Sequence, residues 1–417
     1  MFGRSSRRLL LLKFGLLAMG VIVLAACSGA PPERAAKLAI ATPGTFGDPS
    51  RAAPQALASM PAVAAGNKKA TAKGSTPSGS GRSRAPGRPA AAGNAAAAAG
   101  AGPAGVVFGI AVPSLLSWSP AQQVQQLEAM KATGITSVRV DASWYNTEAN
   151  GPGTYNWTPL DTAVSSIQQV GLTADLIIDG CPPWAAAPGA SGMFAQPASP
   201  ADFGNWAAAV AQRYGSRGAK YFEIWNEPNN PAFWSPAPNP AAYTADLQAA
   251  YGAIKSVDPS AVVLTAGLAP QADSSNSFDI VTFFADMYAD GAQGSFDGVG
   301  DHPYTYPYAP DNVTLGSAWT EMAQTSTSLR SLMVAHGDSA KKIWITEYGA
   351  PTGPGGVSED EQSNEIAQAI AFVKQTNWIA SFYVYSWEDG QADTFGLLDA
   401  NGGQKPAYGA LVAGLGQ

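Results

Sequence analysis

Cysteine and histidine are scarce in this 417-residue sequence, which contains two of each. Cys27 and Cys181 are too few for a disulfide framework, and His302 and His336 stand apart with no cysteine cluster beside them. The sequence also lacks an Asp-rich calcium loop and a phosphate-binding glycine loop. We therefore predict a protein with no metal centre and no cofactor, in which Cys181 is a small buried apolar residue.

Basic side chains are scarce after residue 105. Residues 106–417 contain 11 Lys and Arg against 29 Asp and Glu, a net charge of −18, because 13 of the 24 basic residues come earlier. A domain this acidic repels nucleic acid and suits a neutral or cationic substrate. We therefore exclude a nucleic-acid enzyme, and the 46% hydrophobic content is ample for a large core.

The first 27 residues have the pattern of an export signal. Basic residues at 4, 7, 8 and 13 precede an apolar stretch over 16–26, which is short for a membrane span. The stretch ends in Leu24-Ala25-Ala26-Cys27, which resembles the lipobox of bacterial lipoproteins. That resemblance implies cleavage before Cys27 and a diacylglyceryl anchor on its thiol. An ordinary signal peptide with an incidental cysteine is the alternative.

Residues 28–104 are rich in Ala, Gly, Pro and Ser and contain almost no aromatic side chains. Such a segment buries too little apolar surface to offset the entropy of ordering, so we predict a disordered tether. A flexible chain of this length has an end-to-end distance of roughly 50 Å. Its basic residues favour a position close to anionic lipid or wall polymer.

From residue 105 to 417, short β-branched or aromatic runs alternate with longer segments of helical period. The predicted strands are 106–112, 137–143, 173–178, 221–225, 262–266, 298–302, 343–346 and 382–386. The predicted helices are 121–133, 160–170, 200–214, 240–257, 278–290, 318–336, 359–376 and 406–415. Eight such units predict an α/β fold, a (β/α)8 TIM barrel, with an open doubly wound sheet as the alternative.

Polar and aromatic residues accumulate where the predicted strands end. They follow strands two, three, four, six, seven and eight, as in Trp225-Asn226-Glu227-Pro228 after strand four. In a barrel the carboxyl ends of all strands share the face where active sites are built, whereas an open sheet concentrates its chemistry at one crevice. The distribution therefore favours the barrel.

Glu227 and Glu347 follow strands four and seven, three strand–helix units apart. Hydrolysis of a glycoside with retention needs two carboxyl groups about 5 Å apart, one that protonates the leaving oxygen and one that attacks the anomeric carbon. The alternative is a structural ion pair at the barrel rim. Such a pair would account for one glutamate at a strand end, but it accounts poorly for two glutamates that each follow a strand within a polar and aromatic motif.

The motifs around both glutamates resemble those of clan A retaining glycoside hydrolases. Trp225-Asn226-Glu227-Pro228 and Ile345-Thr346-Glu347-Tyr348-Gly349 match the strand-four and strand-seven motifs of that clan. Phe222-Glu223-Ile224 and His302-Pro303-Tyr304 make family 39 and its bacterial exopolysaccharide-hydrolase relatives the most similar, with family 5 next. The resemblance covers roughly residues 106–415.

The resemblance implies a role for each matching residue. Glu227 is expected to be the general acid/base and Glu347 the nucleophile, and Asn226 is expected to bind the sugar 2-hydroxyl. Arg139 and Tyr304 are expected to hold Glu347 ionised and oriented, since donors to a carboxylate lower its pKa. Alternatively, Asn226 caps a turn, or Arg139 serves only an interior salt bridge with Glu223.

The remaining candidate residues concern the sugar itself. His302 is expected to contact the sugar at the reactive subsite, and Trp387 is expected to form an apolar floor beneath it. Trp144 and Trp184 are expected to line an extended sugar-binding site. For each of these four residues, ordinary packing in the core is the alternative.

These expectations define a function. The chain is expected to hydrolyse O-glycosyl bonds of a β-linked polysaccharide, as an endo-acting enzyme on an extracellular or envelope glycan. We expect a monomer that a lipid anchor holds on the exported side of a bacterial membrane. The alternatives are an exo-acting β-xylosidase-like enzyme, a transglycosylase with the same residues, and a carbohydrate-binding barrel without turnover.

Overall fold

The computed structural model describes residues 105–310, 312, 317–390 and 393–416. The predicted signal peptide with Cys27 and the predicted tether over 28–104 lie outside these described residues. Among the residues that are described, no helix has both the length and the apolar character needed to cross a membrane.

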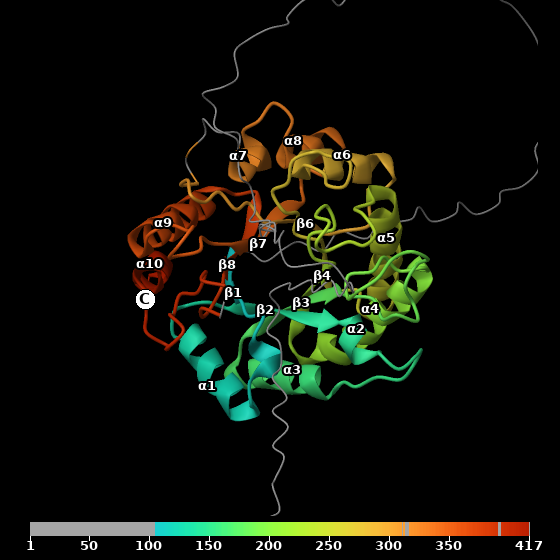
Figure 1. Cartoon of the computed structure of the whole chain (residues 1–417), viewed down its shortest axis with the longest axis horizontal. Coiled ribbons are helices and arrows are strands. Elements are labelled where there is room, and N and C mark those ends of the chain that lie inside the picture. Colours follow the sequence, from blue (N-terminus) through green and yellow to red (C-terminus); the bar gives the residue numbers. More distant parts are fainter. Residues whose placement is uncertain (1–104, 311, 313–316, 391–392, 417) are drawn as a thin grey trace, which may run out of the picture. The chain divides into compact units, whose positions relative to one another are not determined.

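Eight parallel strands form a closed barrel in chain order, so the predicted TIM barrel is confirmed. The barrel closes where β1 pairs in parallel with β8, with Val107 opposite Ser381 and Ala111 opposite Tyr385. The strands, at the centre of Figure 1, are β1 (Val107–Ala111), β2 (Ser137–Ser143), β3 (Thr173–Asp179), β4 (Ala219–Ile224), β5 (Val262–Thr265), β6 (Gly298–Asp301), β7 (Lys342–Tyr348) and β8 (Ile379–Tyr385).

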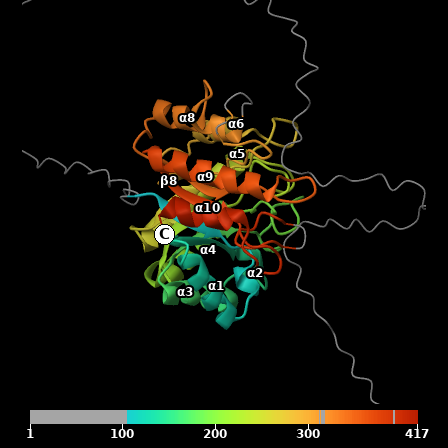
Figure 2. The same cartoon turned by 90° about the vertical axis from the view of Figure 1, so that its left-hand side faces the viewer.

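Helices surround the strands, as Figures 1 and 2 show. Several begin at the start signals seen in the sequence: Ser199 and Asn239 cap the backbone three residues on, and Ser358 forms a capping box with Glu361. The helices are α1 (Pro120–Lys131), α2 (Trp144–Thr147), α3 (Thr158–Val170), α4 (Pro200–Tyr214), α5 (Pro240–Val257), α6 (Ile280–Ala289), α7 (Ala318–Ala323), α8 (Leu329–Ala335), α9 (Glu359–Gln375) and α10 (Pro406–Leu415).

Alternation along the strands separates an outer core from the barrel interior. In β2, Val138, Val140 and Ala142 belong to the large apolar cluster that includes side chains of the helices. Arg139, between them, instead bonds to Glu223 of β4 across the interior. A smaller apolar cluster, which includes Tyr221, Leu264, Trp344 and Tyr383, also lies among strand residues.

Several predicted boundaries differ from the observed ones, and two of the differences have a clear physical cause. The predicted helix over 318–336 is split into α7 and α8, because a Gln-Thr-Ser-Thr run over 324–327 interrupts it and Ser328 caps a new helix in a capping box with Ser331. The predicted strand over 221–225 ends instead at Ile224, because Trp225 has a left-handed backbone with φ of 70°.

Candidate active site

An unusual turn after β4 positions Asn226 and Glu227. The residues on both sides of Asn226 have left-handed backbones, with φ of 70° at Trp225 and 47° at Glu227, and they are the only non-glycine residues of this kind in the described chain. Such conformations cost about 1–3 kcal/mol each and concentrate at functional sites. Neighbouring bonds hold the turn: Trp225 Nε1 donates to the Phe233 carbonyl at 2.7 Å and Glu227 N donates to the Gly267 carbonyl at 3.1 Å.

A bulge in β7 brings Glu347 to the same interior. Ile345 pairs with Phe382 and Tyr348 pairs with Val384, so β7 has one more residue than β8 between these pairs. An extra residue of this kind turns a side chain away from the alternation of the strand. Consecutive residues Thr346 and Glu347 consequently both contact interior side chains.

The two glutamates lie at the distance that retention requires. A carboxylate oxygen of Glu227 and one of Glu347 lie within 4.8 Å of each other. Both residues are nearly buried, with exposures of 9% and 8%. Retaining glycosidases have carboxyl groups about 5–5.5 Å apart, whereas inverting enzymes need about 6.5–9.5 Å to admit a water molecule. The spacing therefore fits direct attack by a carboxylate.

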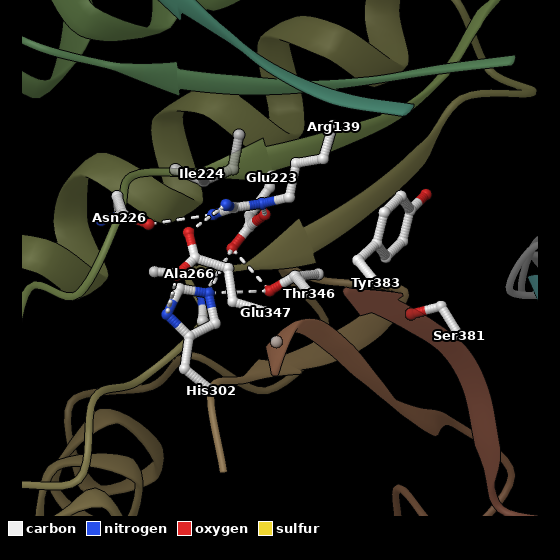
Figure 3. Close-up of polar contacts among 12 residues, drawn as sticks. Arg139, Glu223, Ile224, Asn226, Ala266, His302, Thr346, Glu347, Ser381 and Tyr383 are labelled. Carbon is white, nitrogen blue, oxygen red and sulfur yellow. Dashed lines mark hydrogen bonds and ion pairs between the residues drawn. The ribbon is translucent and has the colours of Figure 1, made fainter. Parts of the chain in front are cut away.

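Glu347 has donors on both carboxylate oxygens. Arg139 Nη1 bonds to Oε1, and Tyr304 Oη donates to Oε2 at 2.8 Å. Burial opposes ionisation, but the charges of His302 and Arg139 and the two hydrogen bonds outweigh it, so the pKa of Glu347 lies below its ordinary value. Figure 3 shows the Arg139 guanidinium and the His302 ring directed toward this carboxylate from two sides.

Glu227 has different neighbours. Its Oε1 lies 3.0 Å from His302 Nδ1, and its Oε2 accepts a hydrogen bond from Asn230 Nδ2 at 2.9 Å. Within the described part of the chain, no lysine or arginine forms an ion pair with it. The two glutamates thus have the same side chain in unlike surroundings, as an acid and a nucleophile need.

Arg139 connects the two motifs. Besides bonding Glu347, it donates from Nε to Glu223 Oε2 at 2.6 Å and from Nη2 to Asn226 Oδ1 at 2.9 Å, and it is 2% exposed. The bond to Asn226 fixes the orientation of the amide, because the oxygen is occupied and the NH2 group remains as the donor. Arg139 therefore forms both the contact predicted with Glu347 and the interior salt bridge with Glu223.

Glu223 is a fully buried acceptor under the site. It accepts hydrogen bonds from Gly267 N at 2.7 Å and Thr346 Oγ1 at 3.0 Å in addition to the bond from Arg139. A buried ion pair of this kind contributes geometry more than net stability, but removing one partner leaves an uncompensated charge. Glu223 thus fixes Arg139, which in turn orients Glu347.

His302 lies against both glutamates, and its own surface is 0% exposed. Nδ1 is 3.0 Å from Glu227 and 3.6 Å from Glu347, and Nε2 is 3.1 Å from Thr346 Oγ1. The ring fits only because residue 267 is glycine: a Cβ there would lie 2.1 Å from His302 Nε2. Direct contact of His302 with a sugar was expected, but the ring is covered by the groups it bonds.

Glu227, His302 and Glu347 also offer atoms of the types that bind metals, all within 4.8 Å of one another. The guanidinium of Arg139 already bonds Glu347, and its positive charge opposes a divalent cation on the same carboxylate. The arrangement suits proton transfer and covalent chemistry between two carboxyl groups.

Comparison with known families bears on the same region. The family model described as "Cellulase (glycosyl hydrolase family 5)" matches residues 99–390, which include both glutamates and all eight strands. The chain belongs to glycosyl hydrolase family 5. Family 5 is part of clan A of the glycoside hydrolases, a clan of retaining enzymes that act on O-glycosyl bonds. No curated protein sequence matches this family 5 chain.

Solved structures show the same fold at low sequence identity. A family 39 glycoside hydrolase from Bacteroides cellulosilyticus WH2 matches with a TM-score of 0.59 and 20% identity, over 75% of this chain and 63% of that chain. A monomeric β-xylosidase from Caulobacter crescentus CB15 matches with a TM-score of 0.55 and 19% identity, over 75% and 69%. A GH5_18 enzyme from Streptomyces cattleya in complex with GlcNAc matches at 0.56 and 17%, over 75% and 80%. The family 5 chain thus spans less than two thirds of the Bacteroides enzyme.

The predicted tryptophans of this family 5 barrel are mostly covered. Trp387 is 1% exposed and donates from Nε1 to Gln126 Oε1 at 2.9 Å, so it has no free face for a sugar. Trp144 is completely buried, and only Trp184, packed edge-on against it, is 36% exposed. The burial of Trp144 follows from the short helix α2, which the sequence did not predict and which begins at this residue.

Sequence reasoning assigned no role to several residues of the site. Tyr385, the last residue of β8, is partly exposed and packs edge-on against Tyr304. Thr346 and Asn230 bond to His302 and Glu227, and Gly267 makes room for the imidazole. Tyr385 directly precedes a predicted strand end, which is the signal that identifies it; Gly267 carries no such signal.

Proposed function

We propose that this family 5 chain hydrolyses a β-linked polysaccharide by double displacement, with Glu347 as nucleophile and Glu227 as general acid/base. The proposal depends on one observation above all: carboxylate oxygens of the two residues lie within 4.8 Å. The lowered pKa of Glu347 keeps it ionised for attack. Glu227, without a guanidinium partner, is the better proton donor.

Each step uses groups whose positions are known. Glu347 attacks the anomeric carbon while Glu227 gives its proton to the leaving oxygen, which forms a glycosyl ester and frees the aglycone. Water then attacks the same carbon, Glu227 accepts its proton, and Glu347 leaves as a carboxylate. We expect the amide NH2 of Asn226 to bond the sugar 2-hydroxyl, and the hydrogen bond from Arg139 to the amide oxygen supports this role.

We assign the apolar platform for the sugar to Tyr385 instead of Trp387. Tyr385 is partly exposed, and its ring lies 6.4 Å from that of Tyr304, which bonds Glu347. A hydrogen bond from Tyr385 Oη to Asp393 Oδ2 at 2.8 Å holds the ring. Trp184 remains the candidate for a more distant sugar, since it is 36% exposed.

The experiment is a depolymerisation screen of the full chain against diverse bacterial and plant β-glycans. On any glycan that is cleaved, Glu347→Gln is expected to reduce turnover to background and Glu227→Gln to reduce it roughly 10²–10⁴-fold. Glu128→Gln is the matched control, because Glu128 is exposed on α1. Wild-type rates in both site variants, or a first product with inverted configuration, would refute the assignment.

Endo action remains our first choice, because an anchored enzyme is suited to a polymer that is exported or accumulates nearby. Exo action is the second candidate, since the similar structures include a β-xylosidase and an exo-β-1,4-mannosidase. Product sizes early in the reaction decide between them: a ladder of oligosaccharides supports endo action, and monosaccharide alone supports exo action. Transfer to added acceptor sugars in place of water would instead reveal a transglycosylase.

We further propose that the chain acts as a monomer on the exported side of the bacterial envelope, attached through an acylated Cys27. The order of basic residues, apolar stretch and Leu24-Ala25-Ala26-Cys27 supports this proposal. Metabolic labelling with a fatty acid is expected to mark the wild type and to be lost in Cys27→Ser. Equal labelling of both proteins would contradict it.

A further inference from the structure

Two aspartates of the barrel interior, Asp141 and Asp179, take no part in the site as described above. Asp141 lies two residues after Arg139 on β2, and Asp179 ends β3 opposite Ser143. The residues between them on each strand, including Val140 and Ile178, belong to the outer core. Both aspartates therefore face inward with Arg139, at the carboxyl ends of their strands where the two glutamates also lie.

The Asp179 side chain is buried without a hydrogen-bond donor. It is only 3% exposed, and within the described chain no donor bonds to its carboxyl group. Glu223, just as buried, accepts three hydrogen bonds. Buried carboxyl groups are normally satisfied in this way, so an unpartnered one at the substrate face points to a ligand that supplies the donor.

Electrostatics connect the aspartates to each other and to the catalytic glutamates. Burial raises the pKa of Asp179 well above its ordinary value, and the charge of Asp141 raises it further. Burial also raises the pKa of Asp141 to about 6, where Arg139 opposes the shift and Glu347 adds to it. Asp141 is partly exposed, so a ligand can reach it.

The interior is short of positive charge. Six carboxyl groups face it, and in the described residues Arg139 is the one arginine or lysine that pairs with any of them, through bonds that go to Glu223 and Glu347. His302 lies against Glu223, Glu227 and Glu347, so neither basic side chain pairs with Asp141 or Asp179. The six are Asp141, Asp175, Asp179, Glu223, Glu227 and Glu347. A neutral sugar offers hydroxyl donors to such a surface, but a cation also offsets its charge, and an anionic sugar is repelled.

We propose that Asp141 and Asp179 form a subsite beside the glutamates that binds the ammonium group of an amino sugar, so that the preferred substrate is a β-linked glycan containing unacetylated hexosamine. This inference rests on the proposed hydrolase function and adds the class of substrate. An ammonium group provides three donors and a positive charge that favours the ionised form of both aspartates, whereas an acetamido group provides one donor and no charge.

The test compares β-1,4-linked oligosaccharides of glucosamine, N-acetylglucosamine and glucose of equal length, which differ only at carbon 2. The full chain is expected to bind and cleave the glucosamine series best. Asp141→Asn and Asp179→Asn are each expected to lower the preference for glucosamine over glucose by roughly tenfold to a hundredfold, as for loss of a hydrogen bond between charged groups. Asp202→Asn is the matched control, with equal charge change on the exposed start of α4.

The preference is a ratio within one protein, so a partly unfolded variant does not distort it, and melting curves identify variants that fail to fold. Calorimetric titration with each oligosaccharide decides the question even if none is cleaved. A wild type that favours the glucose or N-acetylglucosamine series, binds no glucosamine oligomer, or keeps its preference in both variants overturns the subsite. Those outcomes leave the hydrolase proposal intact, because that proposal fails on other results: wild-type rates in Glu227→Gln and Glu347→Gln, or a first product with inverted configuration.

Discussion

The hydrogen bond from Tyr304 to Glu347 provides a quantitative test of how the nucleophile is kept ionised. Replacing Tyr304 with Phe removes one donor to a buried carboxylate and leaves the ring and its packing in place. A hydrogen bond to a charged group contributes about 1.5–3 kcal/mol, and one pKa unit corresponds to about 1.4 kcal/mol. The pKa of Glu347, which is lowered in the wild type, is therefore expected to rise by about one to two units.

The sign of the effect on activity follows directly. Glu347 attacks as a carboxylate, so kcat/KM falls on the acid side as the pH drops through its pKa. In Tyr304→Phe the acid limb of the pH profile, where kcat/KM falls as the pH drops, is expected to move to higher pH by about one unit or more. The limb is measured as kcat/KM against pH on a glycan that the wild type cleaves, or on an aryl β-glycoside.

A matched control removes a hydroxyl elsewhere. Tyr408, on α10, has no hydrogen bond from its hydroxyl to another described residue, so Tyr408→Phe is expected to leave the limb where it is. If Tyr304→Phe lowers the rate but leaves the acid limb unmoved, Tyr304 acts only by packing. A shift to lower pH would show that another group sets the limb.

Two further changes test the support under the site. Gly267→Ala is expected to displace His302 and reduce kcat at least tenfold, since the new Cβ would lie 2.1 Å from Nε2. Gly252→Ala is the control, because the Cβ of residue 252 in α5 would meet open space. This variant is expected to retain activity and to gain up to about 1 kcal/mol in unfolding free energy. Glu223→Gln is expected to lower the unfolding free energy by about 3–5 kcal/mol, measured by denaturant titration, because it leaves Arg139 without its buried counter-ion. An unchanged His302 environment by NMR in the first case, or unchanged stability in the second, would contradict these expectations.

The fold was predictable because its signals are local. Strand and helix periods alternate along the barrel, and Ser-Pro or Asn-Pro marks the start of α1, α4 and α5. The helix over 318–336 was predicted too long because apolar periodicity continues on both sides of a Ser/Thr run, and only the backbone bonds of Ser328 show the break. Helix α2 is a single turn, which is too short for any periodic signal.

The site was less predictable because its contacts join distant segments. Arg139 and Glu347 are 208 positions apart, and Glu223 and Thr346 are 123 apart, so no local pattern relates them. Burial of the aromatic residues was the property hardest to predict from the sequence. Trp184 and Trp144 follow neighbouring strand ends, yet Trp184 is 36% exposed and Trp144 is completely buried. Which face a residue after a strand presents depends on the loop, and loops obey no alternation.

Glu227 and Glu347 are chemically identical, and their surroundings in the barrel give them different catalytic roles. Glu347 lies opposite Arg139, which reaches it from β2, and Tyr304, which follows β6, so donors from two directions hold it ionised. Glu227 follows a strained turn and meets only an imidazole and an amide among the described residues. An exchange of roles would require Glu227 to lose its proton with no guanidinium beside it and Glu347 to gain one against two donors. The surroundings therefore assign nucleophile and acid, and the strand that carries Arg139 fixes which glutamate becomes which.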